Sequence, residues 1–405
     1  MTDIQYTKKG FGLKHVVKEP IQQDYHSELV ERIRGAGHHL SRGELTIKLA
    51  VEFGFCYGVD RTVQYAYETR QRFPDRTIYI TNEVIHNPSV NEKLIEMNMC
   101  FLNGRYAGSK RYDDLTVNDV VLIPAFGVTA GEMGLLQKKG CVIVDTTCGS
   151  VLNVWKNVER YAREGITSIV HGKYWHEETL ATCSQVLQYP GAHYLVLRDL
   201  EETDFVCDHI RAGGPPAAFL EKFSRAMSPG FDPNRHLNRI GLANQTTMMC
   251  SESLEIERRL REAVGARHPG ISLDEHFRAF DTICTATQDR QDAVFNLLQE
   301  KLDLLIVVGG FNSSNTSHLA EIGVEHGVPT FHIEDARCID GPHAIRHKSV
   351  HSNAEERQEH WLPGGPIVVG VTSGASTPNS KTGEVIEKLF DLKGIAVDRE
   401  TEDAA

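Results

Sequence analysis

Short apolar runs alternate with polar turns and amphipathic stretches from Leu45 onward. The apolar runs, read as strands, are Ile47–Phe53, Thr77–Ile80, Val120–Ile123, Val142–Val144, Ser168–Val170, Tyr194–Leu197, Ile240–Ala243, Leu304–Val308, Pro329–Ile333 and Ile367–Val371. Apolar strands that alternate with helices are typical of parallel α/β units. The pattern therefore predicts an α/β protein built on parallel sheets.

A weak internal repeat places a cysteine between a strand and a helix three times. The repeated segments are Phe53-Gly-Phe-Cys56 before the helical pattern Val59–Arg72, Asp145-Thr-Thr-Cys148 before Val151–Glu164, and Asp281-Thr-Ile-Cys284 before Gln288–Lys301. Pro- and Gly-rich text marks an insertion at about 198–239, around a predicted helix Ala217–Met227. Without that insertion the three segments have similar lengths, which indicates three related α/β domains, each presenting one cysteine to a shared centre.

The predicted organisation follows from this repeat. It has an N-terminal extension (1–44), α/β domain 1 with Cys56 (45–147), domain 2 with Cys148 and the insertion (148–283), and domain 3 with Cys284 and a C-terminal tail (284–395). The extension is polar with little periodicity and is expected to be partly helical at His26–Ile33. A further segment, His343–Gly365, is expected to be loop-like.

Composition narrows the class of protein. Of the 405 residues, 40% are hydrophobic and 24% charged, which is ordinary for a soluble globular protein. No apolar run is long enough to span a membrane, and the polar N-terminus has no apolar signal core, so a membrane and export are not expected. A net charge of −12 argues against a nucleic-acid partner but is compatible with a local site for an anionic small molecule. Nine scattered cysteines favour a reducing cytoplasm.

The three repeated cysteines are candidate metal ligands. A helix N-terminus favours the thiolate, which is the form that binds metal. Three thiolates leave one iron of a four-iron cluster open for substrate. Zinc with the same ligands, or three ordinary buried thiols, are the alternatives. The other six cysteines lack a repeated context and are interpreted as packing residues; they are Cys100, Cys141, Cys183, Cys207, Cys250 and Cys338.

Unusual polar residues follow five of the predicted strands. The segments are Asn82–Asn87, His171–Thr179, Asn244–Thr247, Gly309–Thr316 and Thr372–Pro378. Ligands of open parallel sheets bind beyond the carboxyl ends of the strands, and backbone N–H groups at helix starts form anion sites. N-capping alone would explain any one set, but five sets favour a phosphate pocket. The last two of these segments, Gly309–Thr316 and Thr372–Pro378, do not fit a Walker or Rossmann pattern, so the sequence gives little support for an ATP or NAD site.

Histidines and acids in these segments are candidates for catalysis. His86 and His176 each follow a strand and could donate to a diphosphate when protonated, or position a hydroxyl. Glu178 is the preferred proton donor, because a protonated carboxyl near a buried metal site can deliver a proton to a leaving hydroxyl. Glu177 beside it is the competitor, and both could also be exposed charges at a helix start.

Seven motifs occur in a fixed order along the chain: Gly54-Phe-Cys56-Tyr-Gly-Val-Asp60, Glu83-Val-Ile-His86-Asn87, Asp145-Thr-Thr-Cys148, His176-Glu-Glu178, Gln245-Thr246-Thr247, Ser313-Ser-Asn315 and Gly374-Ala-Ser376. This ordered set resembles the 4-hydroxy-3-methylbut-2-enyl diphosphate reductase family, whose members catalyse the last step of the non-mevalonate isoprenoid pathway. The motifs cover about residues 45–390, and the length and the insertion are similar to the longer form of cyanobacteria and plastids.

The resemblance implies a function. It implies three α/β domains around one [4Fe–4S] cluster held by Cys56, Cys148 and Cys284, and reductive dehydroxylation of an allylic diphosphate to isopentenyl and dimethylallyl diphosphates. The implied substrate contacts are His86, His176, Thr246, Ser313, Ser314, Asn315 and Ser376. Glu178 would supply the proton, with Thr246 in the same hydrogen-bond network. The implied electron donor is a small protein of the ferredoxin or flavodoxin type.

Two residues depart from the sequence pattern of this family, and two other functions are alternatives. Phe126 stands where many bacterial members have a histidine, so no substrate contact is assigned to it, and Gly149 follows Cys148 where the longer form tends to have proline. A quinolinate-synthase-like dehydratase would need no external electrons. A non-catalytic iron–sulfur redox sensor would not need five polar strand ends.

Overall fold

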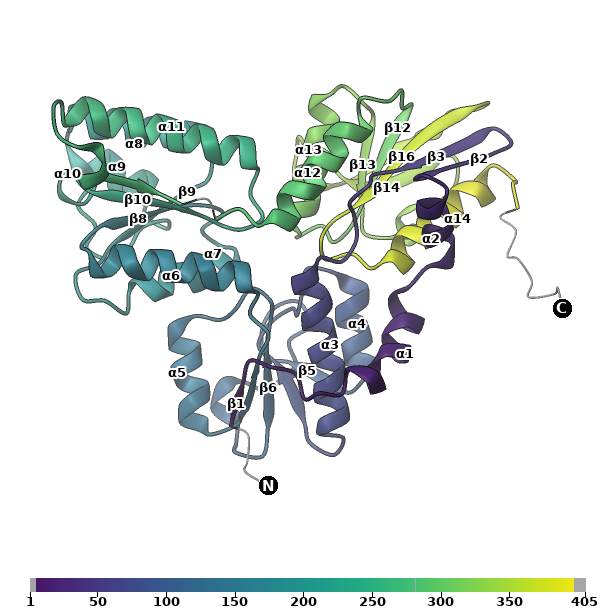
Figure 1. Ribbon diagram of the computed structural model, residues 1–405, viewed down its shortest axis with the longest axis horizontal. Helices are drawn as coiled ribbons and strands as arrows, with labels where there is room; N and C mark the ends of the chain where they lie inside the picture. The colour runs from purple at the N-terminus through teal and green to yellow at the C-terminus, as the bar shows by residue number, and fades with distance from the viewer. Residues whose placement is uncertain (1–4, 281, 397–405) are drawn as a thin grey trace. The chain divides into compact units, whose positions relative to one another are not determined.

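Among the described residues, three β-sheets with mainly parallel strands form the framework of the fold (Figure 1). The structure is a computed structural model that describes residues 5–280 and 282–396. The chain divides into two compact units: the first contains residues 5–10, 72–84 and 94–285, and the second contains 11–71, 85–93 and 286–396. The predicted α/β class with parallel sheets is confirmed.

A five-stranded parallel sheet belongs to the first unit. Its strands, in spatial order, are β1 (Tyr6–Thr7), β7 (Val142–Asp145), β6 (Val120–Ile123), β4 (Ile78–Ile80) and β5 (Met99–Phe101). Strands β4, β6 and β7 are buried at every position, as expected for the inner strands of a covered parallel sheet. Helix α5 (Ala130–Lys139) begins with a capping box between Thr129 and Glu132 and ends at Gly140, whose φ of 67° suits glycine. A 3-10 turn covers Tyr112–Asp114.

A four-stranded parallel sheet completes the first unit. Its strands, in order, are β11 (Phe277–Ala279), β10 (Ile240–Asn244), β8 (Thr167–His171) and β9 (Tyr194–Leu197). The helices are α6 (Gly149–Arg163), α7 (Glu177–Val186), α8 (Leu200–Ala212), α9 (Pro216–Lys222), α10 (Pro233–His236) and α11 (Cys250–Arg267), with a 3-10 turn at Leu273–Glu275. Helix α6 packs against β8 and β10.

The predicted insertion is folded onto this sheet. Helices α8 and α11 lie side by side (Figure 1) and pack together. The helix predicted to reach Met227 ends at Lys222 instead. The chain turns there because Ala226 accepts a hydrogen bond from the Val196 N–H (2.7 Å) and the Ser228 N–H donates to Tyr194 (3.0 Å), so that this segment lies along the edge of β9.

A seven-stranded mixed sheet forms the centre of the second unit. Its strands, in order, are β15 (Glu355–Glu359), β14 (Ala344–Lys348), β13 (Thr330–Ile333), β12 (Leu304–Val308), β16 (Ile367–Ser373), β3 (Leu45–Leu49) and β2 (His39–Arg42). Strands β13, β12, β16 and β3 pair in parallel, whereas β15, β14 and β2 are antiparallel. The helices are α1 (Lys14–Tyr25), α2 (Glu28–Gly35), α3 (Tyr57–Arg72), most of α4 (Pro88–Glu96), α12 (Thr285–Leu297), α13 (Ser314–Glu325) and α14 (Asn379–Leu392), with a 3-10 turn at Ala336–Cys338.

The expectation of a loop at 343–365 was wrong, whereas the helix expected at His26–Ile33 is confirmed as α2 in an extension that is more structured than predicted. The segment 343–365, expected to be loop-like, contains the hairpin β14–β15; every residue of β15 is exposed, so no apolar alternation marks it. The N-terminal extension contains β1, α1, α2 and β2. Helix α2 buries Val30 and Ile33 against α14, and Ser27 caps it by accepting a hydrogen bond from the Val30 N–H (3.3 Å).

Strand β3 belongs to a different sheet from the one predicted from the sequence. It was assigned with β4 and β6 to the first domain, yet it pairs in parallel with β16 and antiparallel to β2. Adjacent strands in a parallel sheet need not be adjacent in sequence, and the apolar run alone does not specify the partner. The part of the chain that the structure describes contains no helix with the length and apolar character needed to cross a bilayer.

Candidate functional site

The three repeated cysteines lie at the carboxyl ends of strands from three different sheets. Cys56 follows β3 and precedes α3, Cys148 follows β7 and is the N-cap of α6, and Cys284 follows β11 and precedes α12. All three are partly buried and free of disulfides. Each cysteine therefore lies at the N-terminal, positive end of a helix. Asp281, the first residue of the third motif, lies outside the described residues.

The same backbone hydrogen bond recurs at each cysteine. The N–H of Cys56 donates to Ala375 (3.0 Å), that of Cys148 to Ala125 (2.9 Å), and that of Cys284 to Thr246 (3.3 Å). In every case the acceptor follows the strand that pairs with the cysteine's own strand: β16, β6 and β10. The sequence repeat therefore corresponds to one repeated structural unit, in which a cysteine turn is joined to the polar segment of the neighbouring strand.

Burial separates most of the remaining cysteines from these three. Burial raises the pKa of the thiols of Cys141, Cys183, Cys207 and Cys338, that of Cys207 to about 11. These four are packing residues with protonated thiols, as expected. Cys100 is exposed on β5, so its interpretation as a packing residue was wrong; Cys250 is partly buried at the start of α11.

Glu178 is held against Thr246 within the first unit. Its side chain is 1% exposed, and its two oxygens accept hydrogen bonds from the Thr246 N–H (2.6 Å) and the Thr246 hydroxyl (3.0 Å). Gln245 joins the same two segments, because its Oε1 accepts hydrogen bonds from the Lys173 N–H and the Thr179 hydroxyl (both 3.1 Å). The carboxylate and the hydroxyl thus form one buried pair at the carboxyl ends of β8 and β10.

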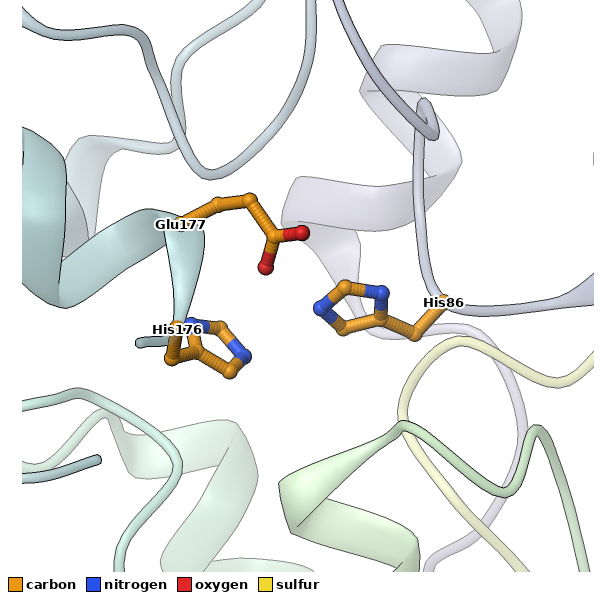
Figure 2. A group of neighbouring side chains, drawn as sticks. All are labelled: His86, His176 and Glu177. Atoms are coloured by element: carbon orange, nitrogen blue, oxygen red, sulfur yellow. The ribbon is translucent and has the colours of Figure 1, made fainter. Parts of the chain in front are cut away.

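His176 and Glu177 occupy the start of α7 (Figure 2). His176 is the N-cap, and its Nδ1 accepts a hydrogen bond from the Glu178 N–H (3.2 Å). A ring nitrogen that accepts carries no proton, so neutral His176 has its proton on Nε2 and is a donor without being cationic. Glu177 accepts a hydrogen bond from the Asn82 amide (3.2 Å) and is less buried than Glu178, so the pairing with Thr246 distinguishes the two acids.

His86 has a matching arrangement in the second unit, where it is 5% exposed (also labelled in Figure 2). Its Nδ1 lies 3.0 Å from Nδ2 of Asn312, which can only donate, so the Nε2 of neutral His86 carries the proton. The carbonyl of His86 accepts a hydrogen bond from the Ser376 hydroxyl (3.2 Å). A Cβ on Gly310 would lie 2.4 Å from this carbonyl oxygen, which explains the glycine.

Ser313, Ser314 and Asn315 open helix α13. The Ser313 hydroxyl accepts hydrogen bonds from the Thr316 N–H (3.3 Å) and the Thr316 hydroxyl (2.9 Å), so it is the N-cap and its own proton is left to donate outward. Asn315 is 2% exposed, and its Oδ1 accepts a hydrogen bond from the Ala375 N–H (2.8 Å). Its buried Nδ2 has no partner among the described residues, which points to a ligand.

The two departures have structural explanations. The ring of Phe126 packs edge-on against His176, with centroids 5.6 Å apart and an interplanar angle of 82°, so Phe126 supports the imidazole by packing. Gly149 is the first residue of α6 directly after the Cys148 cap, so the turn proceeds into the helix without proline.

Sequence reasoning missed Asn312 and Arg290. Asn312 lay within a recognised polar segment, but nothing in the sequence indicated that it would orient His86. Arg290 is 4% exposed, and its guanidinium donates hydrogen bonds to the carbonyls of Gly54 (2.7 Å) and Ala286 (2.8 Å). It ties the turn before Cys56 to the first turn of α12, and its buried position could be recognised only in three dimensions.

Known proteins resemble this chain over nearly its full length. The LytB protein family matches residues 47–390. A 4-hydroxy-3-methylbut-2-enyl diphosphate reductase of Thermosynechococcus vestitus is 49% identical over 96% of each chain. A solved structure of (E)-4-hydroxy-3-methyl-but-2-enyl diphosphate reductase aligns with a TM-score of 0.51 at 26% identity over 85% of this chain and 99% of the other. The Plasmodium falciparum E-1-hydroxy-2-methyl-but-2-enyl-4-diphosphate reductase aligns with a TM-score of 0.63 at 20% identity over 90% and 96%.

Proposed function

Because the chain belongs to the LytB protein family, we infer that it reduces 4-hydroxy-3-methylbut-2-enyl diphosphate to isopentenyl and dimethylallyl diphosphates. Enzymes of this family are iron–sulfur proteins. The observation that carries this inference in the structure is the repeated cysteine turn, with its sulfur at a helix start and its N–H bonded to a polar strand end. A redox sensor would need the cysteines but not the polar segments joined to them.

We propose that Cys56, Cys148 and Cys284 hold an iron–sulfur cluster. All three are partly exposed cysteines outside any disulfide and lie at helix starts, whereas burial keeps four others protonated. We propose one [4Fe–4S] cluster per chain. When bound, such a cluster supplies two electrons one at a time and an iron without a protein ligand. We further propose a small protein of the ferredoxin or flavodoxin type as the electron donor; a cytoplasmic location also remains a prediction.

The diphosphate site is proposed to use neutral donors. The buried Nδ2 of Asn315 and the outward hydroxyl proton of Ser313 are donors oriented by their own hydrogen bonds. Ser314 opens the same helix, and Ser376 would have to exchange its bond to the His86 carbonyl for one to substrate. The contacts proposed from the imidazole donors are the Nε2–H groups of His86 and His176, each fixed by an acceptor bond at Nδ1.

Thr246 is proposed to relay a proton from Glu178. Protonated Glu178 can donate to the Thr246 hydroxyl at 3.0 Å, and that hydroxyl can then donate its own proton to the departing oxygen of the substrate. Burial of the pair excludes bulk water from this step. The leaving group departs as water.

Anaerobic turnover tests this function. Protein purified without oxygen should convert the substrate into the two products only when a reductant is supplied, with both products measured by chromatography. Conversion without reductant would favour a dehydratase of the quinolinate-synthase type. A stable cluster with no conversion at all would favour a redox sensor.

Changes at Asn315 should weaken substrate binding. Asn315→Ala and Ser376→Ala should each make the free energy of substrate binding less favourable by about 1–3 kcal/mol, because one phosphate oxygen loses a hydrogen-bond donor. Asn315→Asp is sharper, because it keeps the acceptor for the Ala375 N–H while replacing the NH2 group with a negative charge. Asn296→Ala, in α12, is the control. Unchanged KM and substrate Kd in all three variants would show that these residues only cap and brace the loop.

A further inference from the structure

Asp145 is a buried carboxylate three residues before Cys148. It is 4% exposed and stands at the end of β7. Its Oδ1 accepts hydrogen bonds from the N–H (3.0 Å) and the hydroxyl (2.5 Å) of Thr147, the residue that directly precedes Cys148. A buried carboxylate needs donors on both oxygens, so the partners of Oδ2 decide how firmly this turn is held.

The partners of Oδ2 come from the N-terminal segment. The Tyr6 hydroxyl donates to Oδ2 (2.7 Å), and the Lys8 ammonium lies 3.7 Å from the same oxygen. Strand β1 places them there, because Tyr6 and Thr7 pair in parallel with Ile143 and Val144 of β7. Tyr6 itself is 44% exposed, so the segment lies on the surface while its hydroxyl reaches a buried group.

The Cys148 turn is thus held from two sides. The Ala125 carbonyl accepts the Cys148 N–H, and the Thr146 N–H and hydroxyl both donate to the Ile123 carbonyl (3.2 and 2.6 Å). The Asp145 carboxylate holds Thr147. This last contact is the one that involves the N-terminal segment, through Tyr6 and Lys8.

We propose that residues 5–8 are a positioning segment for Cys148: Tyr6 and Lys8 anchor Asp145, which fixes the Thr147–Cys148 turn. The inference rests on the proposed role of Cys148 as a cluster ligand. Tyr6 and Asp145 touch neither substrate nor cluster in this assignment. They act through the cysteine, by restricting the rotation of the turn that presents its sulfur.

Tyr6→Phe tests the proposal, with Tyr112→Phe as a matched control. Tyr112 also donates from its hydroxyl to a carboxylate in the first unit (Glu132, 2.9 Å), but that carboxylate lies in α5, caps this helix and, among the described residues, has no bond to the Cys148 turn. In the holoprotein, anaerobic iron release to a chelator should become about tenfold faster in Tyr6→Phe and stay within twofold of wild type in Tyr112→Phe.

Alkylation of the apoprotein gives a second readout. At fixed pH, peptide-resolved alkylation of Cys148 should change several-fold in Tyr6→Phe, while that of Cys56 stays constant. Equal changes at Cys148 and Cys56 would indicate a general loss of structure and would overturn the proposal. Iron release and Cys148 alkylation that both stay at their wild-type rates would overturn it as well. If the wild-type protein binds no iron, the proposed cluster fails, and the ratio of Cys148 to Cys56 alkylation alone decides whether Tyr6 positions the turn.

Discussion

Replacing Cys56, Cys148 or Cys284 singly by serine is expected to abolish reductive activity and to remove most of the iron. Wild-type protein purified anaerobically should contain about four irons and four sulfides per chain. A serine hydroxyl is not deprotonated at neutral pH, so the cluster would keep only two thiolate ligands. Four of the six remaining cysteines offer no good substitute, since burial holds the pKa of their thiols above the usual range. Iron and sulfide counts, EPR and turnover measure the effect.

Cys338→Ser and Cys100→Ser are the controls for this series. Cys338 is a buried packing residue and Cys100 is exposed on β5, so neither change should alter iron content or turnover. Cluster loss in Cys338→Ser equal to that in Cys148→Ser would mean that the ligand set was misassigned. Full activity with zinc as the only metal would refute the cluster altogether.

Glu178→Gln is expected to lower turnover by about 100-fold or more, the usual worth of general acid catalysis. The glutamine carbonyl can still accept the Thr246 N–H, and its NH2 group can donate to the Thr246 hydroxyl, so the buried pair keeps its shape. What the variant loses is the proton that reaches the leaving oxygen through Thr246. Substrate affinity should change much less than kcat, and iron content should stay at the wild-type value.

Glu177→Gln is the control for Glu178→Gln, because it removes a neighbouring carboxylate in the same turn of α7. Glu177 bonds to Asn82 and not to Thr246, so its removal should leave kcat within a few-fold of wild type. Normal turnover in Glu178→Gln together with a loss of turnover in Glu177→Gln would assign the role of proton donor to Glu177. Normal turnover in both variants would mean that the proton comes from another source, such as the diphosphate of the substrate.

The sequence by itself was sufficient for the ten strands with continuous apolar runs and for the cysteine turns, but not for β1, β2, β5, β11, β14 and β15. Strands β6 and β12 have the predicted bounds, because inner parallel strands are buried on both faces and read as continuous apolar runs. Cys148 was placed between a strand and a helix by the same local signals. The polar segments after β8, β10 and β12 were identified because a switch from apolar to hydroxyl, amide and imidazole side chains is itself local.

Only the tertiary structure decided which of these local pieces meet. Strand β3 lies beside β16, more than 300 residues further along the chain, and no apolar run specifies its neighbour. The donor state of His86 depends on Asn312, and the choice of Glu178 over Glu177 depends on Thr246, which lies 68 residues away. The N-terminal segment, read as a polar extension, adds β1 to a sheet, and Tyr6 bonds to a carboxylate 139 residues away. Local propensity and periodicity specify elements, whereas hydrogen-bond partners and burial depend on contacts between distant parts of the chain.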